Sequence, residues 1–287
     1  MTIRLVDRNL LPAVAVTLLF GCSTLPMQRD SGAQQLANHS LPAVEGSESC
    51  QAAIALPDAE DAPALDPSRI DLFVWNMKKG RHPESLSDLQ RMAGNKDLVL
   101  IQEARLEQQP IDALDRAQFW SFAPGYKTTS ASTGVMTLSN TTPLTHCYLT
   151  DHEPWLGSPK AISVTEFGLA STSVTLAVIN VHAVNFTLGV ADFERQILKI
   201  ESVLADHSGP VILAGDFNTW RKRRLEVLLA LAERLDLNEL SFDVDNRIAP
   251  FGNIVDRVFV RGLNAVETST EVVDSSDHNP MSITLSM

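Results

Sequence analysis

The feature that most constrains the fold is a set of short apolar segments that lead into polar residues. The clearest is the apolar run at residues 211–214, which continues through Gly215 into Asp216, Phe217 and Asn218. A continuous apolar run with β-branched residues predicts a short buried strand. Because side chains alternate between the two faces of a strand, Asp216 and Asn218 share one face while Phe217 points toward the core. Asp and Asn are also frequent in turns, so a turn that closes the strand explains this stretch equally well.

Similar apolar runs predict strands along most of the chain, and longer segments with helical periodicity lie between them. The predicted strands are residues 70–76, 97–102, 134–138, 161–167, 173–181, 210–214, 254–260 and 280–285, and the predicted helices are residues 83–93, 191–206 and 222–235, with a weaker one at 111–120. Strands dominate, and the helices do not alternate strictly with them. This order predicts an α+β domain of mixed sheet and helix rather than a barrel or a doubly wound parallel sheet.

Size and charge narrow the class of protein. The chain has 287 residues, which allows one large domain or two small ones, and its 44% hydrophobic content suits a packed core. The formal net charge of -12 argues against a general nucleic-acid coat protein, whose surface would be basic. An enzyme acting on phosphates remains compatible with this charge, because a metal site needs several carboxylates.

The N-terminus has the pattern of an export signal. Arg4 and Arg8 precede an apolar run that ends at Cys22 and is shorter than the ~20 residues needed to span a bilayer, which predicts a signal peptide at residues 1–21. The sequence around Cys22 resembles a bacterial lipoprotein processing site, although Phe20 replaces the usual small residue. We therefore expect a lipid on Cys22 and an exported lipoprotein facing the periplasm, the alternatives being a signal-anchored or a cytoplasmic protein.

The segment after this signal differs in composition from the rest of the chain. Residues 22–67 are rich in Ala, Ser, Pro, Gln and acids without a sustained period, which predicts a flexible tether that carries a folded domain at residues 68–287. Cys50 and Cys147 are an even pair that an oxidising compartment would allow to form a disulfide. Two unrelated buried thiols are the alternative.

Other predicted strands repeat the pattern of a polar residue at an end. Asn76, Glu103, His182, Asp256, Asp277 and His278 lie at such positions. Each has an ordinary explanation by itself: Asn76 fits a turn, His182 a core histidine and Asp256 a cap. Together they indicate a site, because loops that join strand ends carry function.

The residue types favour chemistry on phosphates assisted by a hard metal ion. The oxygen ligands of Asn76, Glu103 and Asp277 suit Mg²⁺ or Mn²⁺. The sequence has no Cys or His cluster at zinc spacing, and no G-x-S-x-G elbow, P-loop or G-x-G-x-x-G motif.

The ordered motifs WNM, LIQEA, NVH, AGDFN, VDRVFV and SDHNP resemble the endonuclease/exonuclease/phosphatase superfamily, which has the DNase I-like fold. The resemblance covers roughly residues 69–287 and is greatest to an uncharacterised bacterial branch, from which no substrate follows. It implies a four-layer α/β/β/α sandwich of two mixed β-sheets. It also implies that Glu103 and Asn76 hold the cation and that Asp277 ligates it or holds a metal-bound water.

The same resemblance assigns catalytic roles to the remaining polar residues. Asp256 would accept a hydrogen bond from His278, which would act as a general base or contact a phosphate oxygen. Asp216 would orient or deprotonate the attacking water. Asn218 would hold a phosphate oxygen, and His182 would contact the phosphate.

A run of four basic residues follows the Asp216 segment and begins a predicted helix. Cations at a helix N-terminus oppose the macrodipole, which indicates that Arg221, Arg223 and Arg224 contact phosphate, although a solvated surface is an equally good explanation. Lys160 and Arg105 are weaker candidates for the same role.

These features predict a monomeric, divalent-metal-dependent phosphodiesterase that is attached to the membrane through its N-terminal lipid. The substrate would be a nucleic acid, a phospholipid head group or a phosphorylated small molecule. The alternatives are a catalytically inactive family member that binds an anionic ligand and a structural lipoprotein of the cell envelope.

Overall fold

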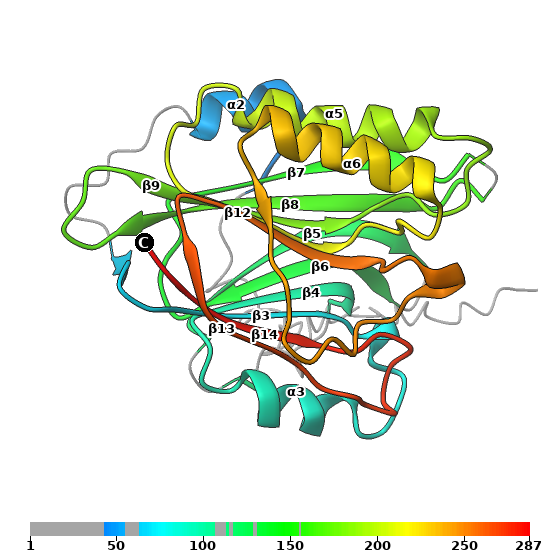
Figure 1. Ribbon diagram of the computed structural model, residues 1–287, viewed down its shortest axis with the longest axis horizontal. Helices are drawn as coiled ribbons and strands as arrows, with labels where there is room; N and C mark the ends of the chain where they lie inside the picture. Colours follow the sequence, from blue (N-terminus) through cyan, green and yellow to red (C-terminus); the bar gives the residue numbers. More distant parts are fainter. Residues whose placement is uncertain (1–42, 55–62, 107–112, 115–116, 129–130, 155) are drawn as a thin grey trace, which may run out of the picture.

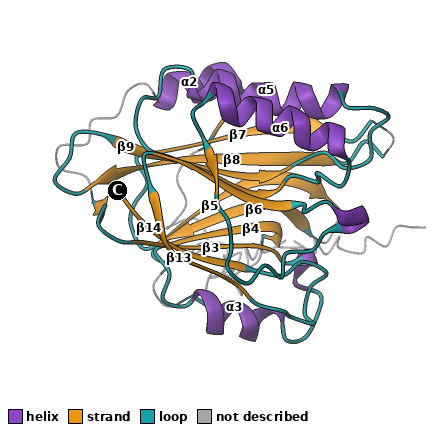
Figure 2. Ribbon diagram, in the orientation of Figure 1, coloured by secondary structure: helices purple, strands orange, loops and turns teal. Residues whose placement is uncertain are grey.

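The computed structural model describes residues 43–54, 63–106, 113–114, 117–128, 131–154 and 156–287. Two β-sheets pack face to face, and helices cover the outer face of each (Figures 1 and 2). The predicted signal peptide and Cys22 lie outside the described residues. Within the described part, no helix combines the length and the apolar character needed to cross a bilayer.

The first sheet has the strand order β1-β7-β8-β9-β10-β12-β11, and β2 also pairs with β8. Its strands are β1 (Val44–Glu45), β2 (Ala64–Leu65), β7 (Thr145–His152), β8 (Pro159–Leu169), β9 (Thr175–His182), β10 (Val211–Asp216), β11 (Asn238–Glu239) and β12 (Asp256–Arg261). Strands β9 and β10 are parallel, whereas β10 and β12 are antiparallel. The sheet is therefore mixed, as predicted.

The second sheet has the strand order β13-β14-β3-β4-β6-β5. Its strands are β3 (Ile70–Asn76), β4 (Leu98–Arg105), β5 (Phe119–Lys127), β6 (Ser132–Ser139), β13 (Asn264–Thr270) and β14 (Met281–Ser286). Here β3 and β4 are parallel and the other pairs are antiparallel.

Helices form the two outer layers. Helices α2 (Ser47–Ile54), α5 (Ala191–Leu204) and α6 (Lys222–Arg234) pack on the first sheet, and α3 (Ser85–Ala93) packs on the second. Two short 3₁₀ turns, η1 (Lys78–Gly80) and η2 (Pro250–Gly252), lie in the loops. The predicted four-layer α/β/β/α sandwich is confirmed.

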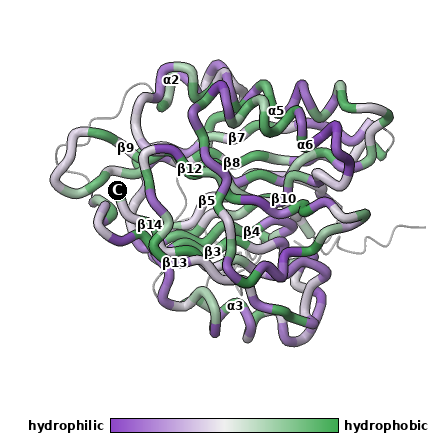
Figure 3. Tube along the Cα trace, viewed as in Figure 1, coloured by the Kyte–Doolittle hydropathy of each residue, from purple (hydrophilic) through white to green (hydrophobic). Residues whose placement is uncertain are grey.

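Alternation along single strands explains the layers. On β3, Leu72 and Val74 belong to the core between the sheets, whereas Phe73 and Trp75 belong to the core beneath α3. Strand β3 is thus buried on both faces, which is why its sequence is a nearly continuous apolar run. Hydrophobic residues follow the strands of both sheets in Figure 3.

The prediction of a flexible tether is wrong for the described residues 44–54 and 64–65. Strand β1 pairs with β7, and Cys50 and Ile54 on α2 are buried in the core beneath α5. Cys50 forms a disulfide with Cys147 on β7, with a Cα–Cα distance of 5.4 Å. Residues 44–54 are therefore part of the folded domain, because a disulfide and a helix with one apolar face fix them to the sheet edge.

The predicted weak helix at residues 111–120 is wrong at its end and lies partly outside the described residues. Phe119 and Trp120 begin strand β5, which pairs with β6. Pairing with a neighbouring strand thus decides the conformation of a segment whose local pattern was ambiguous.

Candidate active site

The predicted polar residues of the first sheet meet because their strands end at the same edge. Asp216, at the end of β10, lies beside His182, at the end of the parallel strand β9. It also lies opposite Asp256, the first residue of the antiparallel strand β12. The alignment follows from strand direction, since parallel strands end together and an antiparallel neighbour starts where they end.

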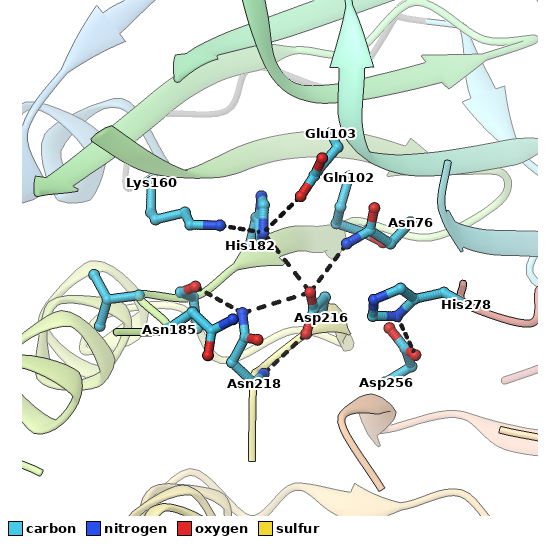
Figure 4. A network of polar contacts seen from close by, with 12 residues as sticks. Asn76, Gln102, Glu103, Lys160, His182, Asn185, Asp216, Asn218, Asp256 and His278 are labelled. Atoms are coloured by element: carbon cyan, nitrogen blue, oxygen red, sulfur yellow. Dashed lines mark hydrogen bonds and ion pairs between the residues drawn. The ribbon is translucent and has the colours of Figure 1, made fainter. Parts of the chain in front are cut away.

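The second sheet contributes Asn76 and Glu103. Asn76 ends β3, and its Nδ2 donates a hydrogen bond to Asp216 Oδ2 over 3.0 Å, which links the two sheets directly (Figure 4). The Asn76 Oδ1 accepts from the backbone N–H of Lys78 at 3.1 Å. The amide is buried and held at both ends, so its orientation is fixed.

Glu103 is placed by an irregularity in β4. The register between β4 and β6 shifts between Ile101 and Ala104, and Glu103 within this interval has a φ of 51°. Such a φ is uncommon for a residue with a side chain and marks strain that surrounding structure must hold. The bulge directs the Glu103 carboxylate to within 3.2 Å of Lys79 Nζ and 3.9 Å of His182 Nε2.

The Asp216 carboxylate is at the centre of the network. Its Oδ1 accepts from the backbone N–H of Asn218 at 2.9 Å, and its Oδ2 lies 3.7 Å from His182 Nε2. Asn218, which also has a positive φ of 51°, donates from Nδ2 to the Ala183 carbonyl at 3.0 Å. Burial raises the pKa of Asp216, against the favourable charge of His278.

Gly215 allows this arrangement. It has a φ of +135°, and a Cβ at this position would lie 2.2 Å from the Val181 carbonyl oxygen of β9. Only glycine permits so close an approach of the two parallel strands immediately before Asp216.

His278 and Asp256 form a pair. His278 Nδ1 lies 2.7 Å from Asp256 Oδ2, and the His278 carbonyl oxygen accepts from Trp75 Nε1 at 2.9 Å. Burial by itself would lower the pKa of His278, but the charge and hydrogen bond of Asp256, with Asp216 and Asp277, raise it to about 10. The imidazole is therefore stabilised as a cation at neutral pH.

His182 is in the opposite state. Burial lowers its pKa well below the ordinary value, and the nearby Lys160, His278 and Lys79 lower it further. Lys160 Nζ lies 2.6 Å from His182 Nε2 (Figure 4). Burial also lowers the pKa of Lys160, although the Asp216 and Glu103 carboxylates oppose this effect. His182 is thus a neutral imidazole that is placed to accept a hydrogen bond.

Lys78 and Lys79 are site residues that the sequence reasoning missed. They follow Asn76 in the segment 76–80, and both have positive φ angles, of 48° and 66°. Lys78 Nζ lies 3.0 Å from Asp277 Oδ2. The sequence signal that could have identified them is a pair of adjacent lysines two residues after the polar strand end at Asn76.

Asp277 lies at the edge of this group of polar residues. Its side chain is 55% exposed and is paired with Lys78. Burial raises the pKa of Asp277, but the hydrogen bond from Lys78 and the charges of His278 and Lys78 together lower it below its ordinary value. Among the described residues, the group whose ligand atoms all lie within 4.8 Å of one another is Asp216, Asp256 and His278. This cluster differs from the predicted ligands Asn76, Glu103 and Asp277, although all six surround the same region.

The predicted phosphate contact by Arg224 is wrong for this arrangement. Arg224 is 1% exposed, and its Nη1 donates to the carbonyl oxygens of Val184 and Asn218 over 2.9 and 2.8 Å. Burial lowers the pKa of Arg224 to about 10. A guanidinium that already satisfies buried carbonyls holds the loops of His182 and Asn218 together, which is a positioning role.

The other two arginines are exposed but lie in different surroundings. Arg221 stacks over the Trp220 ring, with its Cζ 4.2 Å from the ring centroid. Trp220 in turn donates from Nε1 to Asn185 Oδ1 at 2.8 Å. Arg223 instead lines a groove between α5 and α6 with acidic residues of both helices.

The donor set fits a divalent cation of the hard type. Asp216, Asp256 and Glu103 offer carboxylate oxygens, and Asn76 offers an amide oxygen. Oxygen-rich sites of this kind suit Mg²⁺ or Mn²⁺.

Comparison with solved structures confirms the fold. An endonuclease/exonuclease/phosphatase from Beutenbergia cavernae matches with a TM-score of 0.60 at 15% identity, over 77% of this chain and 72% of that chain. The human Nocturnin catalytic domain, solved with a bound sulfate anion, matches at 0.56 and 16%, over 79% and 97%. Sphingomyelinase C from Streptomyces griseocarneus matches at 0.54 and 18%, over 76% and 99%.

The sequence itself also matches a family model. The model of the endonuclease/exonuclease/phosphatase family matches residues 73–278, which include every site residue described above. The predicted resemblance is confirmed, and the protein belongs to the endonuclease/exonuclease/phosphatase family.

Proposed function

We propose that this protein is a divalent-metal-dependent phosphodiesterase. The observation that carries the proposal is the position of Asp216, which Asn76 contacts from one sheet and His182 approaches from the other. The Asp256–His278 pair completes the group, since its ligand atoms lie within 4.8 Å of those of Asp216. A carboxylate, an amide, a neutral imidazole and a charged imidazole are thus available to one phosphorus atom.

Glu103 and Asn76 are assigned to hold the cation. Asp256 and His278 also fit by position, but the hydrogen bond between Asp256 Oδ2 and His278 Nδ1 already uses one ligand atom of each. Asp277 would ligate the ion directly or through water. A bound Mg²⁺ or Mn²⁺ would act as a Lewis acid and offset the charge that develops on the phosphoryl oxygens.

Asp216 would orient the attacking water and accept its proton. The water oxygen forms the new bond to phosphorus, and the bond from phosphorus to the leaving oxygen breaks. A raised pKa makes Asp216 a better proton acceptor near neutral pH than an ordinary carboxylate. The backbone N–H of Asn218 fixes the carboxylate by its hydrogen bond to Oδ1.

His278 would enter the reaction as a cation. With a pKa of about 10, its ring is protonated at neutral pH and cannot serve as a base there. It would donate a hydrogen bond to a phosphate oxygen, which is one of the two roles that the family resemblance leaves open. Lys160 would add a second positive charge beside the neutral His182.

The test is hydrolysis of bis-p-nitrophenyl phosphate with Mg²⁺ or Mn²⁺, with and without EDTA. Glu103→Ala and His278→Ala are each expected to lower kcat/KM by about 10²-fold or more. Glu226→Ala is the matched control, because this glutamate lies on α6 with its side chain 59% exposed. Absence of turnover by the wild type, or equal turnover in all variants, would contradict the proposal and favour an inactive family member that binds anions.

Export to the periplasm with a lipid on Cys22 is a further part of the proposal. The disulfide between Cys50 and Cys147 supports it, because such bonds persist mainly in oxidising compartments. The test is membrane partitioning and intact mass of the wild type and Cys22→Ser. Membrane association of the variant without a lipid mass would rule out the anchor.

A further inference from the structure

A pocket of about 340 Å³ opens directly beside the candidate active site. Glu103 and His182 line the end where the pocket and the site meet. The remainder is lined by strands β5 and β6 and by the start of β8 with the loop before it. This volume lies at the lower end of the roughly 300–1,000 Å³ that small-molecule sites occupy. None of the steps assigned above uses the far part of this space.

Apart from Glu103, His182 and two lysines, the pocket lining is mainly apolar. Tyr126, Leu156 and Pro159 offer accessible apolar surface, whereas Val135 and Ala161 are almost fully buried beneath it. Tyr126 is 51% exposed and Leu156 is 66% exposed. Single exposed apolar side chains are common, but a group of them around one concave surface marks a binding site. The pocket therefore suits an uncharged group.

The end of the pocket nearest the site carries charged side chains, two lysines and Glu103. Lys160 Nζ lies 2.6 Å from His182 Nε2, and Lys79 Nζ lies 3.2 Å from Glu103 Oε2. A phosphodiester has the same order of polarity, because its charged phosphoryl oxygens adjoin uncharged ester groups. The pocket thus continues from the site in the direction in which a substrate would change from charged to apolar.

We propose that this pocket, the ester pocket, binds the ester group that stays on phosphorus and selects an aromatic ring over a small alkyl group at that position. The proposal rests on the proposed function and narrows its substrate class. Tyr126 offers a ring for offset stacking, an arrangement that aromatic groups prefer. Leu156 and Pro159 add apolar contacts on the same pocket. Tyr126 and Leu156 are therefore the specificity-determining residues.

The kinetic test compares bis-p-nitrophenyl phosphate with methyl p-nitrophenyl phosphate, which share a leaving group. Tyr126→Ala is expected to lower kcat/KM for the first substrate by about tenfold and to leave the second nearly unchanged. Comparing each variant with the wild type cancels the difference in intrinsic reactivity between the two substrates. Tyr126→Phe keeps the ring and should retain the preference for the first substrate. The control with unchanged activity is Leu229→Ala, an exposed residue on α6. An equal effect of Tyr126→Ala on both substrates would overturn the proposal.

A binding measurement separates this proposal from the proposed function. Calorimetric titration with phenylphosphonate and methylphosphonate requires no turnover, and the wild type is expected to bind the phenyl compound about tenfold more tightly. Tyr126→Ala should remove that preference. Selective binding without hydrolysis would defeat the proposed function and leave the ester pocket supported. Hydrolysis with equal binding of both phosphonates would defeat the ester pocket alone.

Discussion

Replacement of Asp256 with asparagine is expected to change His278 from a group that is charged across the neutral range into one that titrates near or below pH 6.5. Asparagine retains a side-chain oxygen that can accept a hydrogen bond from His278 Nδ1, in place of the 2.7 Å bond to Asp256 Oδ2. The negative charge is lost. Burial then acts with less opposition, and burial lowers the pKa of a histidine.

The size of the expected change in pKa follows from the pKa of His278 in the wild type. A pKa of about 10, against the ordinary 6.5, means that the surroundings favour the charged ring by on the order of 5 kcal/mol. The side chain of His278 is 14% exposed and that of Asp256 is 4% exposed, so solvent screens the pair only weakly. Asp256 contributes both the largest favourable charge and the hydrogen bond. Most of the preference should therefore disappear in Asp256→Asn.

The direct assay is an NMR titration of the histidine ring signals in metal-free protein, with the His278 signal assigned by its loss in His278→Gln. The second assay is the dependence of kcat/KM on pH. If the charged ring contacts phosphate, a pKa near 6.5 leaves roughly 1% of the variant competent at pH 8.5, a loss of about 10²-fold relative to pH 5.5.

The reasoning would be refuted if the His278 ring of Asp256→Asn titrated as in the wild type. It would also be refuted if the activity ratio of variant to wild type did not vary between pH 5.5 and 8.5. The first result would mean that groups other than Asp256 stabilise the charged form of His278. The second would remove the charged ring from the reaction.

Three further predictions concern stability. Burial raises the pKa of Glu166 from 4.5 to about 7; because the folded pKa is the higher one, the stability that this group gives is present below pH 4.5 and lost as the pH rises through 7. In urea unfolding, the free energy of unfolding of Glu166→Gln should therefore rise by ~3 kcal/mol relative to that of the wild type between pH 4.5 and 8. The same pH dependence in both proteins would contradict this prediction. The double variant Cys50→Ala/Cys147→Ala removes a cross-link with a sequence separation of 97 and should lower the free energy of unfolding by ~4–5 kcal/mol. The wild type in dithiothreitol should lose the same amount, and an unchanged free energy of unfolding would disprove the prediction. Arg224→Met should lower the melting temperature because it leaves buried carbonyls unpaired, whereas Arg221→Ala should not, and equal melting temperatures would reject the positioning role.

The central strands could be predicted from local sequence. The predicted strand at residues 70–76 coincides with β3, and the predicted strand at 210–214 covers most of β10. Both strands are buried on both faces, so nearly every position must be apolar and the pattern is strong. The predicted helix at 222–235 matches α6 to within one residue, because its buried apolar residues Leu228, Leu231 and Ala232 recur at helical spacing.

The outer strands could not be predicted in this way. Strands β5 and β13 are the edges of their sheet, and β7 has only the two-residue β1 beyond it. The sequence of β5 contains Pro124 and Gly125, and most residues of β13 are exposed. Such segments become strands because a neighbour offers hydrogen bonds, which local sequence does not report.

The candidate site shows the same difference between what local sequence predicts and what tertiary structure determines. By itself, the sequence determined which polar residues end the buried strands, because a polar residue interrupts an apolar run visibly. Only the tertiary structure decided which of them meet: strand pairing joins Asp216 to His182 and Asp256, and packing of the two sheets joins it to Asn76. Those contacts link segments far apart in the chain, so no local pattern encodes them.

Tertiary structure also decided the fate of groups that look alike in sequence. Arg221 and Arg224 belong to one basic run, yet Arg221 is exposed while Arg224 is buried against main-chain carbonyls. Cys50 lay in a segment of tether-like composition, yet it is joined to Cys147 on the sheet. The sequence determined the chemical groups and the strands that carry them. The burial of a residue and its hydrogen-bond partners depend on distant segments that pack around it. Only the packing of the two sheets therefore determines them.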